Sequence, residues 1–160
     1  MKFLVCSDSH GAVRPLLGLV RGTAPDCLLF LGDGVRDVRT VLAAHPSLPA
    51  LCVAGNNDAY DDTPTQRTAL LCGKRVFMAH GHTYGVKRGL WRLIAAARLS
   101  RADIVLFGHT HTPLCSYERG MLVVNPGSVF MCPDRRRTYA LLSIDETLGR
   151  AGAAVHSLNI

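Results

Sequence analysis

The sequence predicts an α/β protein in which two β-sheets pack face to face and helices flank them. Three observations lead to this fold class. Apolar runs of strand length recur along the first two thirds of the chain, helical patterns separate the early runs, and the last part is rich in further strand-like segments. The 160 residues fit one domain, 1–160, that is long enough to bury a substantial core.

Five apolar runs carry the strand prediction. Each run is continuous rather than alternating, which is typical of strands that are covered on both faces. Each run also ends in a polar turn that contains or adjoins glycine or histidine. The runs lie at residues 3–6, 27–31, 51–54, 76–79 and 104–107.

Three helices are expected from 3.6-residue periodicity. The first two lie at roughly residues 13–21 and 35–44, and Pro46 ends the second. The third lies at roughly residues 87–99. The apolar face expected for this third helix consists of Leu90, Trp91, Leu93, Ile94 and Ala97.

The later part of the chain predicts antiparallel strands. Residues 68–71 and 75–79 flank Gly73-Lys74 and are expected to form a hairpin. Segments 114–117 and 121–124 flank a second turn, and segments 139–144 and 153–157 complete the strand-rich end. We expect these strands to form a second, more antiparallel sheet that packs on the first.

Composition narrows the class of protein. No apolar run reaches the roughly 18 residues that a membrane span needs, and polar residues from Ser7 interrupt the short apolar N-terminus. A cytoplasmic protein without a membrane partner is therefore expected. The net charge of +6 favours anionic partners, namely phosphates, nucleic acid or acidic lipid head groups. The six cysteines lack C-x-x-C spacing, so we interpret them as reduced thiols, mainly in the core, rather than as a metal site or disulfides.

Each of the five apolar runs is followed by side chains that can bind a metal ion. Ligands in α/β sheets gather just beyond the carboxyl ends of strands, so five strand ends can bring these side chains to one point. One such motif would be weak evidence, whereas five in register with five strands are strong evidence. The motifs are Asp8-Ser9-His10, Gly32-Asp33, Gly55-Asn56-Asn57-Asp58, His80-Gly81-His82 and Gly108-His109-Thr110-His111.

The types of these side chains indicate the metal. Imidazoles and carboxylates without thiolates suit Mn, Fe, Zn or similar divalent ions. Seven candidate ligands exceed the three or four of one open catalytic site, and they suffice for two ions if one carboxylate bridges them. Two ions about 3.5–4 Å apart form the clamp that is used to transfer phosphoryl groups to water. The seven are Asp8, His10, Asp33, Asn56, His80, His109 and His111.

In their order, the motifs D-x-H, G-D, G-N-x-D, H-G-H and G-H-T-H resemble those of the calcineurin-like metallophosphoesterases, especially the compact single-domain phosphodiesterase branch. The similarity extends through Asn125-Pro126-Gly127-Ser128 to Leu142. It implies an αββα fold and a metal-dependent phosphoesterase, with phosphodiesters ahead of monoesters. A hydroxide that bridges two ions would be the nucleophile, and the expected metal is Mn, with Fe, Zn or Ni as alternatives.

The resemblance also assigns roles to residues. Asp8, His10, Asp33 and His111 would hold the first metal ion. Asp33, Asn56, His80 and His109 would hold the second, with Asp33 as the bridge. Asn56 would also act in catalysis by donating to a phosphate oxygen. His82 would lie outside the ligand set and orient a ligand or contact the substrate.

Asn57 departs from the family pattern. Many members have a histidine at this position that can protonate the leaving group, and an amide cannot do so near neutral pH. Activated leaving groups are therefore expected to react best. Asn57 and Arg88 are the predicted substrate contacts, and Lys87 and Arg92 could rim the same pocket and hold phosphate.

Simpler interpretations compete with the metal site. Asp8-Ser9-His10 could cap the first helix, and the glycine-containing segments around Asp33 and Asn56 could be plain turns. Asp58 could stabilise its turn or orient a ligating histidine. Ser128 is a weak candidate for a substrate contact. Residues 135–137, all arginine, could form a solvated loop.

Two other classes of function compete with the phosphoesterase. The same fold occurs in a retromer scaffold subunit that has lost part of the metal set, so a non-catalytic interaction module is the main alternative. The second alternative is a nucleic-acid-binding protein. Because aromatic residues are not interleaved with the basic ones, we expect nucleic acid only as a possible substrate. Exposed strand edges are compatible with a homodimer.

Overall fold

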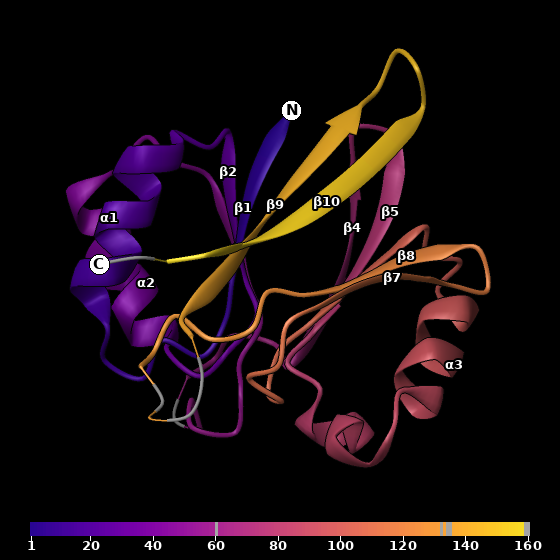
Figure 1. Ribbon diagram of the computed structural model, residues 1–160, viewed down its shortest axis with the longest axis horizontal. Helices are drawn as coiled ribbons and strands as arrows, with labels where there is room; N and C mark the ends of the chain where they lie inside the picture. Colours follow the sequence, from indigo (N-terminus) through magenta and orange to yellow (C-terminus); the bar gives the residue numbers. More distant parts are fainter. Residues whose placement is uncertain (60, 132, 134–135, 159–160) are drawn as a thin grey trace.

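Two five-stranded sheets pack face to face, and helices cover their outer sides (Figure 1). The computed structural model describes residues 1–59, 61–131, 133 and 136–158. This arrangement confirms the predicted α/β two-sheet sandwich. In the first sheet the strand order is β10-β9-β1-β2-β3. Its strands are β1 (Lys2–Cys6), β2 (Cys27–Phe30), β3 (Ala50–Cys52), β9 (Thr138–Asp145) and β10 (Arg150–Ser157).

The second sheet has the strand order β4-β5-β6-β8-β7. Strands β5, β6 and β8 are parallel, and the two outer strands run antiparallel to their neighbours. The predicted hairpin at Gly73-Lys74 is present as the β4–β5 pair. The strands are β4 (Gln66–Leu71), β5 (Lys74–Ala79), β6 (Ile104–Phe107), β7 (Leu114–Glu118) and β8 (Met121–Asn125).

The last two strands correct one expectation. Strands β9 and β10 were expected in the second sheet, but β9 pairs antiparallel with β1 in the first, and β10 extends that sheet further. Each sheet is therefore mixed. The physical reason is that the inner faces of β9 and β10 complete the hydrophobic layer between the sheets, where Ala140 and Leu142 are buried beside Phe3 and Val5.

Burial on both faces explains why the apolar runs are continuous. Along β1, Phe3 and Val5 point into the layer between the sheets, whereas Leu4 and Cys6 point toward the helices. Helices α1 (Val13–Thr23) and α2 (Val35–Ala44) cover the first sheet, and α3 (Trp91–Leu99) packs on the second (Figure 1). Burying each such side chain stabilises the fold by about 1.5–3 kcal/mol.

The third helix is shorter than predicted. Two short 3-10 helices, η1 (His82–Tyr84) and η2 (Val86–Arg88), precede it. Gly85 and Gly89 interrupt the helical backbone with φ angles of 63° and 141°. Leu93, Ile94 and Ala97 are buried as predicted, and Leu90 is partly buried, but Trp91 is 68% exposed and does not belong to the apolar face.

The structure also places most of the cysteines. Cys6 and Cys27 are buried, Cys52 and Cys72 are partly buried, and Cys115 is exposed, and all five are free thiols. The sixth, Cys132, lies outside the described residues. In the described part of the chain, no helix has the length and apolar character that crossing a bilayer requires.

Candidate metal centre

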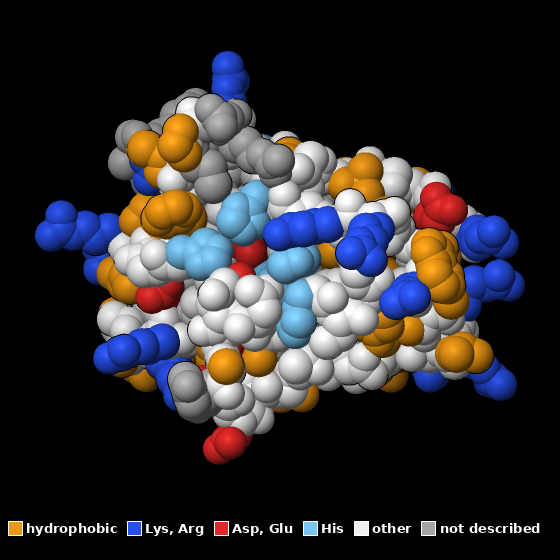
Figure 2. Space-filling model, turned by 90° about the horizontal axis from the view of Figure 1, so that it is seen from below, with side chains coloured by type: hydrophobic (Ala, Val, Ile, Leu, Met, Phe, Trp, Pro, Cys, Tyr) orange, Lys and Arg blue, Asp and Glu red, His pale blue; other side chains and the backbone are white. Residues whose placement is uncertain are grey.

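The carboxyl ends of five strands meet at one end of the sandwich. Strands β1, β2 and β3 are parallel in the first sheet, and β5 and β6 are parallel in the second. The motifs that follow these strands all open onto this end. Figure 2 views the molecule from this end and shows histidines gathered around acidic side chains, with Lys and Arg side chains beside them. The two sheets thus supply one common site.

The backbone turns sharply at the candidate ligands. Asp8, His10, Asp33, His109 and His111 have φ angles of 53°, 41°, 57°, 67° and 55°. This left-handed region is uncommon for residues other than glycine, although Asp and His tolerate it better than most. Such backbone strain clusters at functional sites, because the surrounding fold holds the residue in place.

Glycine at position 55 permits a close approach between the turns. A Cβ atom there would lie 2.1 Å from Oδ1 of Asp33 and 2.5 Å from its backbone nitrogen. Only a residue without a side chain lets the turn after β3 pack directly on Asp33.

The first group of candidate ligands is Asp8, His10 and His111, whose ligand atoms lie within 4.8 Å of one another. Oδ1 of Asp8 lies 3.1 Å from Nε2 of His111 and 3.9 Å from Nε2 of His10. The other oxygen, Oδ2, accepts hydrogen bonds from the Ser7 hydroxyl at 2.5 Å and from the His109 backbone N–H at 3.1 Å. These bonds orient the buried carboxylate so that Oδ1 faces the two imidazoles.

The second group is Asp33, His80 and His109. Nε2 of His80 lies 3.5 Å from Oδ2 of Asp33 and 3.2 Å from Nδ1 of His109. The other nitrogen of His80, Nδ1, lies 2.6 Å from the Leu31 carbonyl oxygen. A carbonyl only accepts, so Nδ1 carries a proton, and once Nε2 has lost its own proton its lone pair faces the site.

Asp33, a member of the second group, also faces the first group. Its Oδ2 is 3.8 Å from Nε2 of His10 and 3.5 Å from Nε2 of His80. Nε2 of His80 is in turn 3.9 Å from Oδ1 of Asp8. Two clusters of hard and borderline ligands therefore adjoin across one carboxylate, and this donor set fits divalent cations.

The charges of the site are strongly coupled. Burial would raise the pKa of Asp33, but hydrogen bonds from His80 and Asn57 outweigh it and hold that pKa well below its usual range. Burial would lower the pKa of His80, yet the bond to Asp33 and the charges of Asp8 and Asp33 raise it. Burial, helped by the positive charges of His80 and Lys87, lowers the pKa of His109 to about 4.

The turn after β3 carries Asn56 and Asn57. Asn56 is exposed. The next residue, Asn57, donates from its amide nitrogen to Oδ2 of Asp33 at 2.6 Å and from its backbone to Oδ1 at 2.8 Å. The ligand and catalytic roles of Asn56 stay predictions.

Asp58 joins two turns by hydrogen bonds, which decides between its two expected roles, stabilising its turn or orienting a ligating histidine. Its carboxylate accepts four backbone hydrogen bonds, at 2.7 Å and 2.9 Å on Oδ2 and at 3.1 Å twice on Oδ1. The structure therefore supports the turn-stabilising role rather than contact with a histidine. The four N–H donors belong to Asp33, Gly34, Val35 and Gly55.

His82 lies beside the second group. Its ring centroid is 5.4 Å from that of His80 and 6.1 Å from that of His109. Burial and the charge of His80 lower the pKa of His82. Its Nδ1 atom is buried and has no hydrogen-bond partner among the described residues. The predicted substrate contact Arg88 lines a pocket together with His82 and His109.

Several supporting residues were not foreseen as such. Ser7 orients Asp8, and no pattern in the sequence marks it. Asp37 is buried in the first turn of α2 and accepts hydrogen bonds from the Ser9 hydroxyl at 2.5 Å and the Gly11 backbone at 2.8 Å. Ser9 therefore bonds Asp37 and does not cap α1, whose N-cap is Ala12 without a side-chain hydrogen bond.

The segment after β8 shapes the site from behind. Ser128 is buried, and its hydroxyl donates to the Asp8 carbonyl at 2.8 Å. Asn125 donates from its side chain to the Gly108 carbonyl at 3.0 Å. Ser128 thus holds the backbone of a candidate ligand. Of residues 135–137, Arg136 is exposed and Arg137 is partly buried, and residue 135 lies outside the described residues.

Comparison with known sequences identifies the family. The profile of the calcineurin-like phosphoesterase superfamily domain matches residues 1–147. The chain belongs to this family. It is 32% identical over 150 residues to the probable metallophosphoesterase YsnB of Bacillus subtilis (strain 168), covering 91% of this chain and 85% of YsnB. It is 27% identical to the phosphodiesterase YfcE of Escherichia coli (strain K12), covering 81% of this chain and 79% of YfcE. The chain is thus a hydrolase of phosphoric ester bonds.

Solved structures agree with this assignment. A protein of Streptococcus pneumoniae TIGR4, described as a predicted phosphoesterase, superposes with a TM-score of 0.77 at 27% identity, covering 90% of this chain and 83% of that one. Vps29 from Entamoeba histolytica, whose structure is a complex with zinc, superposes with a TM-score of 0.75 at 19% identity, covering 99% of this chain and all of Vps29. The second likeness concerns the fold alone.

Proposed function

We propose that this phosphoesterase is a phosphodiesterase with a dinuclear metal centre. One observation carries the proposal: two separate three-residue groups of candidate ligands adjoin across the carboxylate of Asp33. One ion would be held by Asp8, His10 and His111 with Asp33, and the other by His80 and His109 with Asp33 and Asn56. Manganese is the proposed metal, because a mixed imidazole and carboxylate set suits it.

When bound, two such ions would supply a hydroxide nucleophile and neutralise charge on the phosphoryl group. The residues of this chain prepare the site for that chemistry. Ser7 and the His109 backbone fix the orientation of Asp8, and the Leu31 carbonyl fixes the tautomer of His80. Because these partners are already in place, ligand positions cost little reorganisation on binding.

The leaving group receives little help from the residues nearby. Asn57 is bound to Asp33 and has no acidic proton near neutral pH. The pKa of His82 is lowered, so this residue is neutral at pH 7 and contacts the substrate as a hydrogen-bonding group. We infer that diesters with acidic alcohols, such as aryl esters, react fastest.

The test is hydrolysis of an activated aryl phosphodiester with added Mn²⁺. Wild type is compared with Asp33→Ala and with Asp62→Ala, an exposed carboxylate on the neighbouring loop. We expect Asp33→Ala to lose about a hundredfold or more in kcat/KM and Asp62→Ala to match wild type. Equal activity in the wild type and the Asp33→Ala variant would sink the proposal.

Metal content tests the dinuclear part separately. Elemental analysis of the Mn²⁺-loaded protein is expected to give two ions per chain, and one ion per chain would contradict the bridging role of Asp33. Two bound ions without turnover of any ester would instead favour the alternative, a protein-interaction scaffold on this fold. A cytoplasmic location, a homodimer and nucleic acid as a substrate stay predictions from the sequence.

A further inference from the structure

A basic pocket opens directly beside the second group of candidate ligands. It has a volume of about 390 Å³. Two of its residues, His82 and His109, belong to the metal motifs, so the pocket is continuous with the proposed centre. It is lined by His82, Tyr84, Gly85, Lys87, Arg88, Trp91, Arg92 and His109.

The charge of this pocket favours an anion. Three cationic side chains, Lys87, Arg88 and Arg92, line it, and none of its eight described residues is acidic. Among the residues that the structure describes, Arg39 forms an ion pair with Asp61 at 2.9 Å, whereas these three pocket cations form none. Positive charges gathered in a concave site without counter-charges raise the local concentration of anions such as phosphate.

Trp91 adds a flat aromatic surface to the same pocket. It is the single tryptophan of the chain, and it is 68% exposed because the glycine break at Gly89 starts α3 there. The guanidinium carbon of Arg92 lies 4.9 Å from the centre of the indole ring. An exposed ring beside cations is the arrangement on which nucleic bases stack, with about 1–3 kcal/mol per base.

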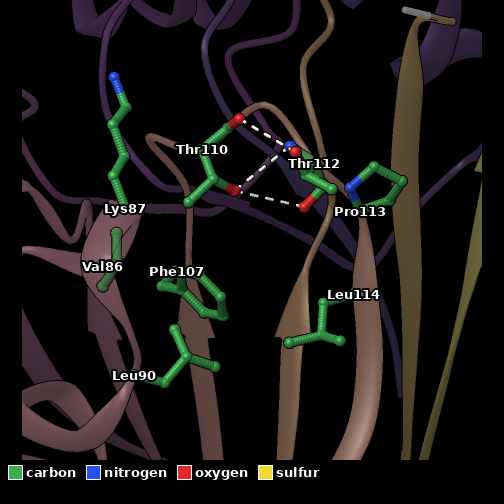
Figure 3. Close-up of a pocket in the computed structure, with 8 residues that line it drawn as sticks. All are labelled: Val86, Lys87, Leu90, Phe107, Thr110, Thr112, Pro113 and Leu114. Carbon is green, nitrogen blue, oxygen red and sulfur yellow. Dashed lines mark hydrogen bonds between the residues drawn. The ribbon is translucent and has the colours of Figure 1, made fainter.

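A second pocket, on the other side of Lys87, has a different character. It has a volume of about 450 Å³, and five of its eight lining residues are apolar, among them Val86, Leu90 and Phe107. Figure 3 shows Lys87 extending away from these apolar side chains, while Thr110 and Thr112 hydrogen-bond to one another. This second pocket is lined by no arginine and no tryptophan, so an anionic aromatic group fits the basic pocket better.

We propose that the basic pocket binds one arm of the substrate as a nucleotide, with its base against Trp91 and a further phosphate on Lys87, Arg88 and Arg92. The unpartnered Nδ1 of His82 offers that arm one more polar contact. The substrate class is thus a phosphodiester in which one arm is a nucleoside that carries a second phosphate. The cleavage step, but not the binding of the arm, rests on the proposed phosphodiesterase function.

Binding is tested first by the fluorescence of Trp91, which reports from inside the pocket because no other tryptophan is present. The metal-loaded protein is titrated with ADP, with adenosine and with pyrophosphate as a competitor. We expect saturable quenching by ADP, and affinities about tenfold weaker for adenosine and for pyrophosphate, since each lacks one of the two recognised groups. No quenching by ADP, or pyrophosphate that competes as well as ADP, would overturn the proposal.

Two variants locate the site. Arg88→Ala is expected to weaken ADP binding about tenfold, in line with the loss of one charged contact. Arg98→Ala is the matched control, because Arg98 is an exposed arginine in the last turn of α3 that does not line the pocket. Equal weakening by both variants would mean that net charge, and not the pocket, binds ADP.

Turnover then tests the substrate class. Wild type is expected to cleave an adenosine dinucleotide with a terminal 5′-phosphate about tenfold more efficiently than the same dinucleotide without it. Arg88→Ala is expected to lose this preference and Arg98→Ala to keep it. Quenching by ADP without turnover of any diester would overturn the proposed function and leave the pocket standing. Turnover of aryl diesters without quenching or phosphate preference would overturn the nucleotide pocket alone.

Discussion

Replacing Asp58 by asparagine should loosen the metal centre without touching a candidate ligand. Asp58 accepts four backbone hydrogen bonds that join the turn after β2 to the turn after β3. The asparagine has the same shape but presents an NH2 group in place of one acceptor oxygen. Two backbone N–H groups, either those on Oδ1 or those on Oδ2, then lose their acceptor.

The magnitude follows from these contacts. A hydrogen bond to a charged acceptor contributes about 1.5–3 kcal/mol, so two lost bonds correspond to about 3–6 kcal/mol. Asp58 is partly exposed, and water that reaches it roughly halves this loss. We therefore expect the free energy of unfolding to fall by about 2–3 kcal/mol, which lowers Tm by about 5–10 °C for a domain of this size.

Thermal unfolding and Mn²⁺ titration measure the two consequences. Asp33 donates its backbone N–H to Asp58, so its displacement should also weaken metal binding about tenfold or more. Asp62→Asn serves as the control in the same loop. If Asp58→Asn unfolds and binds metal like this control, the four hydrogen bonds do not position the turn and the reasoning is wrong.

Three further predictions follow from the site. Gly55→Ala should lower the free energy of unfolding by about 2 kcal/mol or more, because the added Cβ would lie 2.1 Å from an Asp33 oxygen. Gly18→Ala in α1 is the control: its Cβ would meet nothing within 4 Å, so the free energy of unfolding should rise by about 0.5–1 kcal/mol. Chemical denaturation measures both changes. Ser7→Ala should weaken Mn²⁺ binding about tenfold by freeing Asp8, and calorimetry that finds wild-type affinity would contradict this. Because the pKa of His80 is raised, metal binding near pH 7 should release a proton, and the metal affinity should increase as pH rises through that pKa. Calorimetry in buffers of different ionisation enthalpy measures the release. Equal binding heats in those buffers would contradict the release of a proton.

Much of the fold could be predicted because it depends on local pattern. Strands covered on both faces require continuous apolar runs, and such runs matched β1, β2, β5 and β6 closely. The sheet that a strand joins is a different question. Strands β9 and β10 carry the pattern of either sheet, and only the packing of their inner faces beside Phe3 and Val5 put them in the first.

The start of α3, beside the basic pocket, also could not be predicted from local pattern. Periodicity extended the third helix back to residue 87, since the apolar spacing continues through Leu90 and Trp91. Glycines at 85 and 89, with positive φ, stop the helix and leave Trp91 exposed. A glycine in a sequence permits such a conformation without requiring it, so its effect appears only with the tertiary structure.

The sequence by itself determined the types of side chain that form the metal centre and the strand ends from which they come. The side-chain types follow from the chemistry of metal ligands, and the strand ends follow from patterns that span only a few residues. Tertiary structure decided what orients them: Ser7 on Asp8, Asp58 across two turns, and Asn57 on Asp33. His111 and Asp8, 3.1 Å apart, are separated by 103 residues. Contacts over such separations depend on how the two sheets pack, and no local pattern records that packing.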